Sequence, residues 1–448
     1  MHDHPTPAEL EGFVWNQLSA EGVSAVVAHL VRGCDECRAV AAHFFCALVG
    51  PGEPPEVSLT PEEDAAYDAV MERAIASALR KERELFEERK REALALIADA
   101  DPESLPAIPA HLRGVPLFEA LLERSLSLRH HNPEGMVRLA QWARLTADRL
   151  RPQELGPKQV ADYQCRAWIE LGNAHRVADD LDLADDALGW AVTLFLQGTR
   201  DEALAARLFD VQASLYGDRR LFDLAATTLD LVLATHRRRG DEHLAGRALI
   251  KKGIYVGYRG EAEEAVGLIG EGLRLVDADR DPRLLFVGAH NQARFLMDCG
   301  RFRDARLAVF NLKSRGIDPG GRVNELKVRW LEGQINAGLG KLDRAERQLR
   351  DVQQEFEAME LGYKAALAGL ELGAVLLRRN RPDEASEKVL AAADVFMALN
   401  IGRETGASLL VLRKTFEKKV TDAALLDYVI GLLRGLEDGP KKPEPSDG

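Results

Sequence analysis

Four side chains near the start of the sequence have the types and spacing of a metal site. Cys34 and Cys37 form a Cys-x-x-Cys pair, a spacing that brings two thiolates to one metal ion where a turn opens a helix. His29 stands five residues before Cys34, at the end of a predicted helix, and His4 stands just before another. Two imidazoles and two thiolates are a donor set of tetrahedral structural zinc. We therefore predict one structural Zn²⁺ per chain, bound by His4, His29, Cys34 and Cys37.

Other ligands and other uses of the cysteines stay open at this point. His2 competes with His4 for the N-terminal position, and His43 and Cys46, three residues apart on the next predicted helix, are reserve ligands. A redox pair would use the same Cys-x-x-Cys spacing, although no alternating strand and helix pattern surrounds it. Two unrelated surface cysteines are the remaining alternative.

Three short predicted helices would position these ligands. The segment Thr6-Pro7-Ala8-Glu9 is a capping box that starts the first helix directly after His4. Gly33 permits a sharp turn between His29 and the cysteines. Because a unit of about 45 residues is small for a self-sufficient core, metal binding would supply much of its stability.

The arrangement resembles the zinc-binding anti-sigma domain of bacteria, whose pattern is an N-terminal His or Cys followed by H-x3-C-x2-C. The likeness covers residues 2–49, and the interval from His29 to Cys34 is one residue longer here. The resemblance implies a sigma factor or a related transcription protein as partner. It also implies that helices after the zinc motif help to hold that partner, for which residues 62–98 are the candidates.

The rest of the sequence repeats a helical pattern with a period of about 40 residues. Two columns of small residues would let paired helices approach closely, and a third column would turn the chain through the left-handed conformation. The columns are Gly172, Ala213, Gly253, Ala293, Gly333 and Gly373; Ala184, Ala225, Ala265, Ala305, Ala345 and Ala385; and Gly260, Gly300, Gly340 and Asn380. Each copy is therefore predicted to be a helix–turn–helix hairpin that buries its apolar face by stacking on its neighbours.

These copies resemble the tetratricopeptide repeat. The first copy is the most similar, with Trp168, Leu171, Gly172, Ala184, Leu188 and Ala191 at the positions of that family's pattern. Later copies keep the small residues but lose the tryptophan, and the period exceeds the family's period of about 34 residues, so longer helices are expected. The resemblance implies an α-solenoid.

A solenoid of this family binds peptides or proteins on its concave face, which the first helix of each pair lines. The resemblance places on that face the polar residues Asn173, Arg176, Ser214, His290, Arg294 and Gln334. Each of them also fits an ordinary solvated position. Trp330, at an equivalent position, is either an anchor for a partner or a core residue.

The whole pattern predicts an all-α protein in five parts. The parts are a zinc-stapled three-helix domain (1–50), a proline-rich linker (51–61), a long helix with a connecting segment (62–115), the solenoid (116–436) and a disordered tail (437–448). The charge-dense segment 80–92 of the long helix is expected to be a solvated face with ion pairs between successive turns.

Composition excludes several classes of function. The 448 residues include 59 Lys and Arg against 72 Asp and Glu, a net charge of −13. This balance argues against direct nucleic-acid binding, which Lys and Arg drive, and no polybasic cluster suggests a membrane surface. No apolar run is long enough for a transmembrane helix, and no signal peptide is expected at the start. A cytoplasmic location is therefore the expectation.

The sequence contains none of the phosphate-binding, nucleophile-elbow or metalloprotease motifs, so we expect no enzyme. The first hypothesis is a bacterial regulator or adaptor that engages a protein partner. The alternative is a general scaffold of tetratricopeptide type with a purely structural zinc module and no role in transcription. A weaker third hypothesis is a redox switch in which oxidation of Cys34 and Cys37 releases zinc.

Overall fold

The computed structural model describes residues 4–15, 17–31, 34–49, 61–98, 107–314, 316, 321–399 and 403–436. These residues form 21 α-helices and one 3-10 helix, without a strand among them, so the all-α prediction is confirmed. Nearly all of the predicted linker and the whole predicted tail lie outside the described residues. The chain divides into two compact units, residues 1–124 and 125–448. Among the helices described, none is both long enough and apolar enough to span a membrane.

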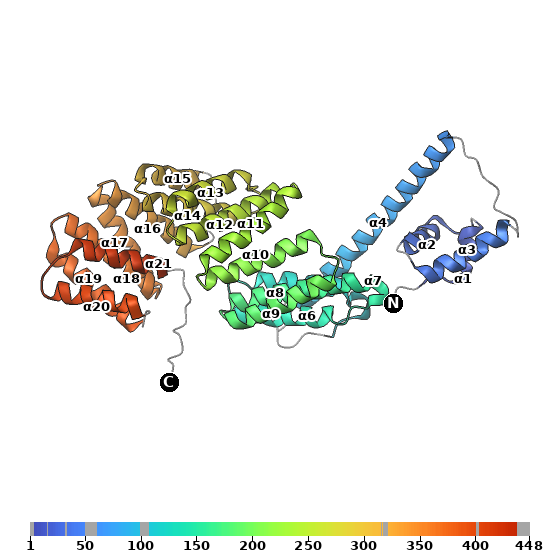
Figure 1. Cartoon of the computed structure of the whole chain (residues 1–448), viewed down its shortest axis with the longest axis horizontal. Coiled ribbons are helices and arrows are strands. Elements are labelled where there is room, and N and C mark those ends of the chain that lie inside the picture. Colours follow the sequence, from blue (N-terminus) through green and yellow to red (C-terminus); the bar gives the residue numbers. More distant parts are fainter. Residues whose placement is uncertain are drawn as a thin grey trace. The chain divides into compact units, whose positions relative to one another are not determined.

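The first unit begins with three short helices and continues into a long one (Figure 1). Its helices are α1 (Pro7–Val14), α2 (Ala20–Val31), α3 (Asp35–Val49) and α4 (Pro61–Ala98), then the 3-10 helix η1 (Ala110–Leu112), and α5 (Val115–Ser127), which reaches into the second unit. The three short helices enclose a small core, in which Leu10, Val26, Cys37 and Ala41 are buried. So few buried side chains stabilise the fold weakly, which leaves room for a metal to contribute.

Helix α4 presents charges to solvent along most of the segment 80–92. Residues 80–88 are exposed apart from the half-buried Phe86. Towards its end the helix buries Ala93 and Ile97, and the Nζ atom of Lys90 lies 2.7 Å from a carboxylate oxygen of Glu123. The long helix is therefore tied down at its C-terminal end.

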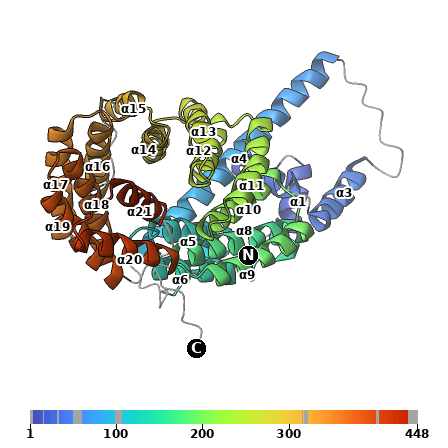
Figure 2. The ribbon, with the colours of Figure 1, turned by 60° about the vertical axis from the view of Figure 1, so that its left-hand side comes forward.

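The second unit is a stack of antiparallel helix pairs (Figures 1 and 2). After α6 (Pro133–Ala147) and the short α7 (Pro152–Leu155), the pairs are α8 (Pro157–Val177) with α9 (Leu181–Gln197), α10 (Glu202–Asp218) with α11 (Phe222–Arg238), α12 (Glu242–Tyr258) with α13 (Ala262–Leu275), α14 (Pro282–Asp298) with α15 (Phe302–Ser314), α16 (Arg322–Gly338) with α17 (Leu342–Ala358), α18 (Gly362–Arg378) with α19 (Pro382–Ala398), and α20 (Arg403–Glu417) with α21 (Ala423–Leu436). Figure 2 shows the pairs along an arc, with α14, α16 and α18 on its inner side and α15, α17 and α19 outside. The predicted α-solenoid is confirmed.

The repeat columns do what their residue types predict. All six alanines of the second column, from Ala184 to Ala385, have 0% of their surface exposed. A Cβ atom added at Gly253 would lie 2.6 Å from Cγ1 of Ile269 and 3.1 Å from the carbonyl oxygen of Ala265, so this glycine is where the two helices of a pair touch. The turn column has positive φ angles, from 59° at Asn380 to 101° at Gly260. Asp179 and Arg220 take the same conformation in the first two pairs without a residue type that signals it.

The last helix lies on the inner side of the arc rather than extending the stack outward (Figure 2). Leu426, Val429 and Leu433 of α21 are fully buried, and they share one core with α16–α20. The hydroxyl of Tyr363 on α18 donates a hydrogen bond of 2.6 Å to the carbonyl of Leu433. The C-terminal pair therefore closes the hydrophobic core of the last repeats, and α21 occupies part of the inner surface.

Candidate metal centre and binding surface

The four predicted zinc ligands come together in the first unit. His4, His29, Cys34 and Cys37 each offer one donor atom, and these atoms all lie within 4.8 Å of one another. The Nδ1 atom of His4 is 3.5 Å from the Sγ atoms of both Cys34 and Cys37. A tetrahedral zinc with Zn–S and Zn–N bonds of ordinary length separates a nitrogen and a sulfur ligand by about 3.5 Å. The geometry is therefore compatible with zinc at this position.

Local sequence rules place each ligand. The side chain of Thr6 accepts a hydrogen bond of 3.3 Å from the backbone of Glu9, whose carboxylate accepts one of 2.7 Å from the Thr6 backbone. This capping box, as predicted, starts α1 directly after His4. His29 lies in the last turn of α2, Cys34 directly precedes α3 and Cys37 lies in its first turn.

Two further contacts hold the site in shape. The guanidinium of Arg38 donates a hydrogen bond of 3.2 Å to the carbonyl of Leu30, which fixes the end of α2 against the start of α3. The rings of His4 and His29 meet edge to face with their centroids 5.0 Å apart. Burial, and then the neighbouring Cys34 thiol, raise the pKa of Cys37 to about 11. Without a cation the Cys37 thiol holds its proton at neutral pH, and a bound divalent ion would displace that proton.

The structure separates one of the alternative ligands, His43, from the four predicted ones. His43 is exposed and lies outside the four-residue group, and its ring contacts Phe44 at a centroid distance of 6.1 Å. His2 and the side chain of Cys46 fall outside the described residues.

The six residues predicted to bind a partner are not equivalent in the structure. Asn173 is buried and accepts a hydrogen bond of 3.1 Å from Arg176, whose guanidinium also lies 2.6 Å from Asp218. Trp330 is only 4% exposed, and its indole nitrogen donates to the carboxylate of Glu371 at 2.5 Å. Of the two alternatives for Trp330, the structure therefore shows the core position.

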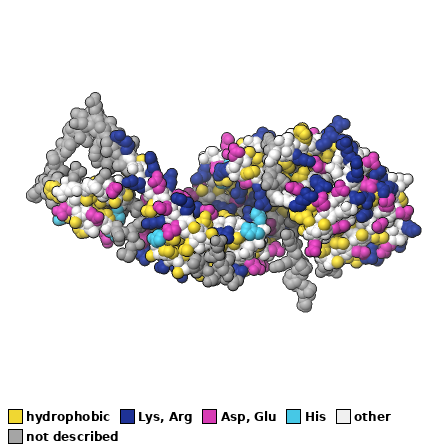
Figure 3. Space-filling model, turned by 180° about the vertical axis from the view of Figure 1, so that it is seen from behind, with side chains coloured by type: hydrophobic (Ala, Val, Ile, Leu, Met, Phe, Trp, Pro, Cys, Tyr) yellow, Lys and Arg dark blue, Asp and Glu magenta, His cyan; other side chains and the backbone are white. Residues whose placement is uncertain are grey.

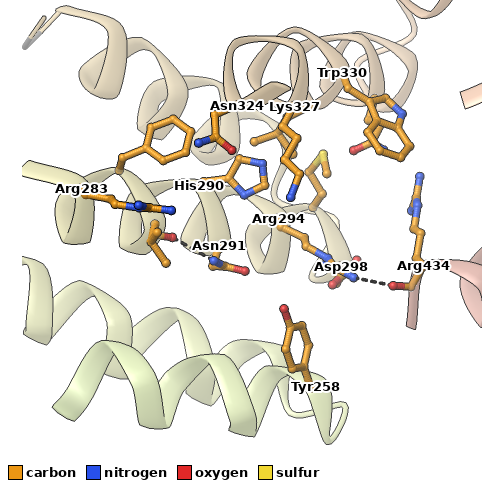
Figure 4. A pocket seen from close by; sticks show the side chains of 15 residues that line it. Tyr258, Arg283, His290, Asn291, Arg294, Asp298, Asn324, Lys327, Trp330 and Arg434 are labelled. Carbon is orange, nitrogen blue, oxygen red and sulfur yellow. Dashed lines mark hydrogen bonds between the residues drawn. The ribbon is translucent and has the colours of Figure 1, made fainter. Parts of the chain in front are cut away.

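The other three, together with the buried Trp330, line a cavity of about 280 Å³ on the inner side of the solenoid (Figure 4). Its walls come from α12, α14, α16 and α21, and they include His290, Arg294 and Gln334. A guanidinium nitrogen of Arg294 donates to the carbonyl of Arg434 at 3.0 Å, and the same guanidinium lies 5.5 Å from the centre of the Tyr258 ring. Gln334 donates to Glu371 at 2.8 Å. The inner surface is thus a polar cleft in which Arg294 and Gln334 are already held in place by hydrogen bonds.

The inner surface also carries cations that the sequence reasoning missed. Arg207, Arg247 and Lys327 lie at one repeat position, six residues before the small residues at 213, 253 and 333. The regular spacing was a signal that could have found them. Ser214, which the resemblance placed on this face, donates instead to the backbone carbonyl of Asp210 at 3.0 Å.

Comparisons with known proteins identify no family for this chain. No protein-family model matches the chain, and no curated protein matches it either. Among solved structures, the chain is similar to aspartyl phosphate phosphatase F from Bacillus subtilis, with a TM-score of 0.47 and 9% identity over 87% of this chain and 93% of that one. It is also similar to a STAND signal-transduction ATPase with a tetratricopeptide repeat sensor from Pyrococcus horikoshii, with a TM-score of 0.39 and 11% identity over 94% of this chain and 54% of that one.

Proposed function

We propose that this protein is a non-enzymatic adaptor that holds a protein or peptide segment on the inner side of its solenoid. The observation that carries the proposal is the polar cleft between α12, α14, α16 and α21, which joins helices far apart in the sequence. Hydrogen bonds such as that from Arg294 to Arg434 hold this surface in shape before any partner arrives. A preorganised surface loses less side-chain entropy on binding.

The proposal gives the first unit a second, separate task. One Zn²⁺ bound by His4, His29, Cys34 and Cys37 would stabilise the three-helix module, whose own core is small. The module would then present α1–α3 as a docking surface. By its resemblance to anti-sigma zinc domains, its partner would be a sigma factor or a related transcription protein in the bacterial cytoplasm. The alternative is a general scaffold in which zinc only stabilises the fold of the module.

Photo-crosslinking in the native host tests the solenoid part of the proposal. A photoreactive p-benzoylphenylalanine would replace Asn291, which lines the cleft on α14, and in a matched control Leu307, which is 58% exposed on the outer helix α15. We expect discrete protein crosslinks from the inner position and none of the same mass from the outer one. Equal crosslinking from both positions, or none from Asn291, would contradict partner binding on the inner side.

The same cross-linking approach separates the two readings of the zinc module. With the photoreactive residue at Glu11, an exposed position on α1, a sigma factor among the crosslinked proteins would support the transcription role. Crosslinks to other proteins alone would favour the general scaffold.

A further inference from the structure

A cluster of charged side chains on α8, α10 and α12 holds more cations than carboxylates. Asp210 lies 2.7 Å from Lys251, 3.3 Å from Arg247 and 3.4 Å from Arg207. Glu170 accepts two hydrogen bonds from Arg207, of 2.6 and 2.7 Å. With Arg176 on Asp218, four cations therefore share three carboxylates. Asp210 and Glu170 are therefore already paired with cations, and the cluster holds one cation more than it holds carboxylates.

A further cation faces this network from the turn after α5. Arg129 is exposed to solvent and forms no ion pair with any described residue. Desolvation by the surrounding protein lowers its pKa to about 10, and the charges of four arginines add to this effect. These are Arg176, Arg247, Arg207 and Arg283. At neutral pH the side chain is still charged, so the lowered pKa reflects first the desolvation of that charge and then its repulsion by the other cations.

The excess of cations over carboxylates continues into the cleft of Figure 4. Arg283, at the start of α14, and Lys327, on α16, point into the cleft from two neighbouring pairs. Neither makes an ion pair within the described part of the chain. The one carboxylate among the lining residues is Asp298, which faces Arg294 and Arg434. The cleft therefore offers two cations that have no counter-charge among the residues that the structure describes.

This excess of positive charge is local to the inner surface, since the chain as a whole is acidic, with a net charge of −13. On the face of the molecule shown in Figure 3, basic and acidic side chains are interspersed over the solenoid. A concave surface with low-dielectric walls focuses the field of unpaired charges, and so raises the local concentration of ligands of opposite sign.

We propose that the inner surface formed by Arg129, Arg283, Lys327 and the network around Asp210 binds an acidic peptide segment of a partner protein. This inference rests on the proposed function and names the chemistry of the partner. Guanidinium groups bind carboxylates through paired charge-assisted hydrogen bonds, and Lys327 supplies a point charge deeper in the cleft. Asp and Glu side chains spaced along an extended peptide would meet these cations in turn.

A display selection on the full-length, zinc-loaded protein tests the inference. Random 12-residue peptides would be selected on the wild-type chain and their Asp and Glu content compared with that of the unselected library. The tightest acidic peptide would then be measured by fluorescence anisotropy, beside its counterpart with every Asp changed to Asn and every Glu to Gln. We expect acidic enrichment, and an affinity at least about tenfold weaker for the amide peptide.

Two double variants locate the binding. Arg283→Ala with Lys327→Ala should weaken binding of the acidic peptide by about tenfold or more. The matched control, Arg303→Ala with Arg344→Ala, removes two exposed arginines of the outer helices α15 and α17 that also lack an ion pair among the described residues, and should leave the affinity unchanged.

Several results would overturn the inference. Selection of neutral peptides that compete with the Asn291 crosslink would leave the proposed function standing and refute its acidic specificity. Recovery of no peptide at all would count against both. Equal loss of affinity in the two double variants would show unspecific charge attraction. Self-association of the chain that Arg283→Ala with Lys327→Ala abolishes would assign the surface to a second copy instead.

Discussion

His4, His29, Cys34 and Cys37 lie in segments that are regular for reasons unconnected with metal. His4 precedes a capping box, His29 ends a helix and the two cysteines open the next one. Since three separate helix boundaries meet at one point, a bound ion would cross-link all of them. Loss of either cysteine should therefore affect the folding of the first unit as well as its metal content.

Replacement of Cys34 and Cys37 by Ser tests the metal site directly. Elemental analysis of the purified wild-type chain should give about one zinc per chain, and the double variant should give almost none, because serine does not supply a thiolate. Cys299→Ser, which changes a half-buried cysteine of the solenoid, is the control and should retain the zinc. Zinc that stays bound in the double variant would refute this ligand set.

Glu346 is the residue at which we expect a resolvable effect of pH. Its side chain is 10% exposed and lies 2.9 Å from both Arg350 and Arg381, with Arg379 also in contact. Burial raises its pKa, but hydrogen bonds from Arg350 and Arg381 and the adjacent charges outweigh burial and lower the pKa below its ordinary value of 4.5. The ionised carboxylate therefore stabilises the fold above that pH, and this stability is lost as the pH falls through the lowered pKa.

We expect Glu346→Gln to lower the melting temperature at pH 7 and to reduce its further decline as the pH drops below 4.5. Thermal unfolding followed by circular dichroism over a pH series measures both effects. Glu387→Gln, which changes an exposed glutamate of α19 with no ion pair among the described residues, should follow the wild-type curve. Identical pH curves for Glu346→Gln and the wild type would contradict the stabilising role.

At the scale of the helix pair, the small residues recur in every repeat because the two helices of a pair touch at these positions. Gly253→Ala would place a Cβ atom 2.6 Å from Ile269, on the side where the partner helix leaves no space. Overpacking of this kind costs about 1–3 kcal/mol, so we expect a lower melting temperature. Denaturant or thermal unfolding of the variant, read at the helical circular dichroism signal, measures it.

Gly267→Ala is the matched control for that substitution. Gly267 lies inside α13 of the same pair, and a Cβ atom there would meet nothing within 4 Å. Alanine lowers the free energy of a helix interior by about 0.5–1 kcal/mol relative to glycine, so stability should rise slightly or stay the same. A loss of stability at Gly267 as large as that at Gly253 would show that helix contact is not the cause.

At the scale of the whole molecule, all four candidate zinc ligands lie in the first compact unit and the repeat array lies in the second. A strong chelator should therefore lower or abolish one calorimetric transition and leave the other in place, because only a fold that binds the metal gains stability from it. Differential scanning calorimetry with and without the chelator measures this. A shift of both transitions together would mean that the two units unfold as one.

The sequence by itself determined the local features of this protein. Capping boxes, helix-turning glycines and columns of small residues act over a few residues or one helix pair, and so the candidate ligands, the all-α class and the period were all predictable. Helix ends were predictable only where a residue type marks them. Arg220 turns the chain at φ 59° with no glycine or asparagine to signal it, because the stacked neighbours compensate the local strain.

Only the tertiary structure decided which side chains of the inner face are already in use. Trp330 is tied to Glu371, 41 residues away, and Arg294 is tied to Arg434, 140 residues away. Whether Arg283 and Lys327 find an ion-pair partner likewise depends on which carboxylates the solenoid brings near them, and within the described ranges it brings none. Burial and ion pairing depend on distances between repeats, which the curvature of the array sets and which no spacing along one helix contains.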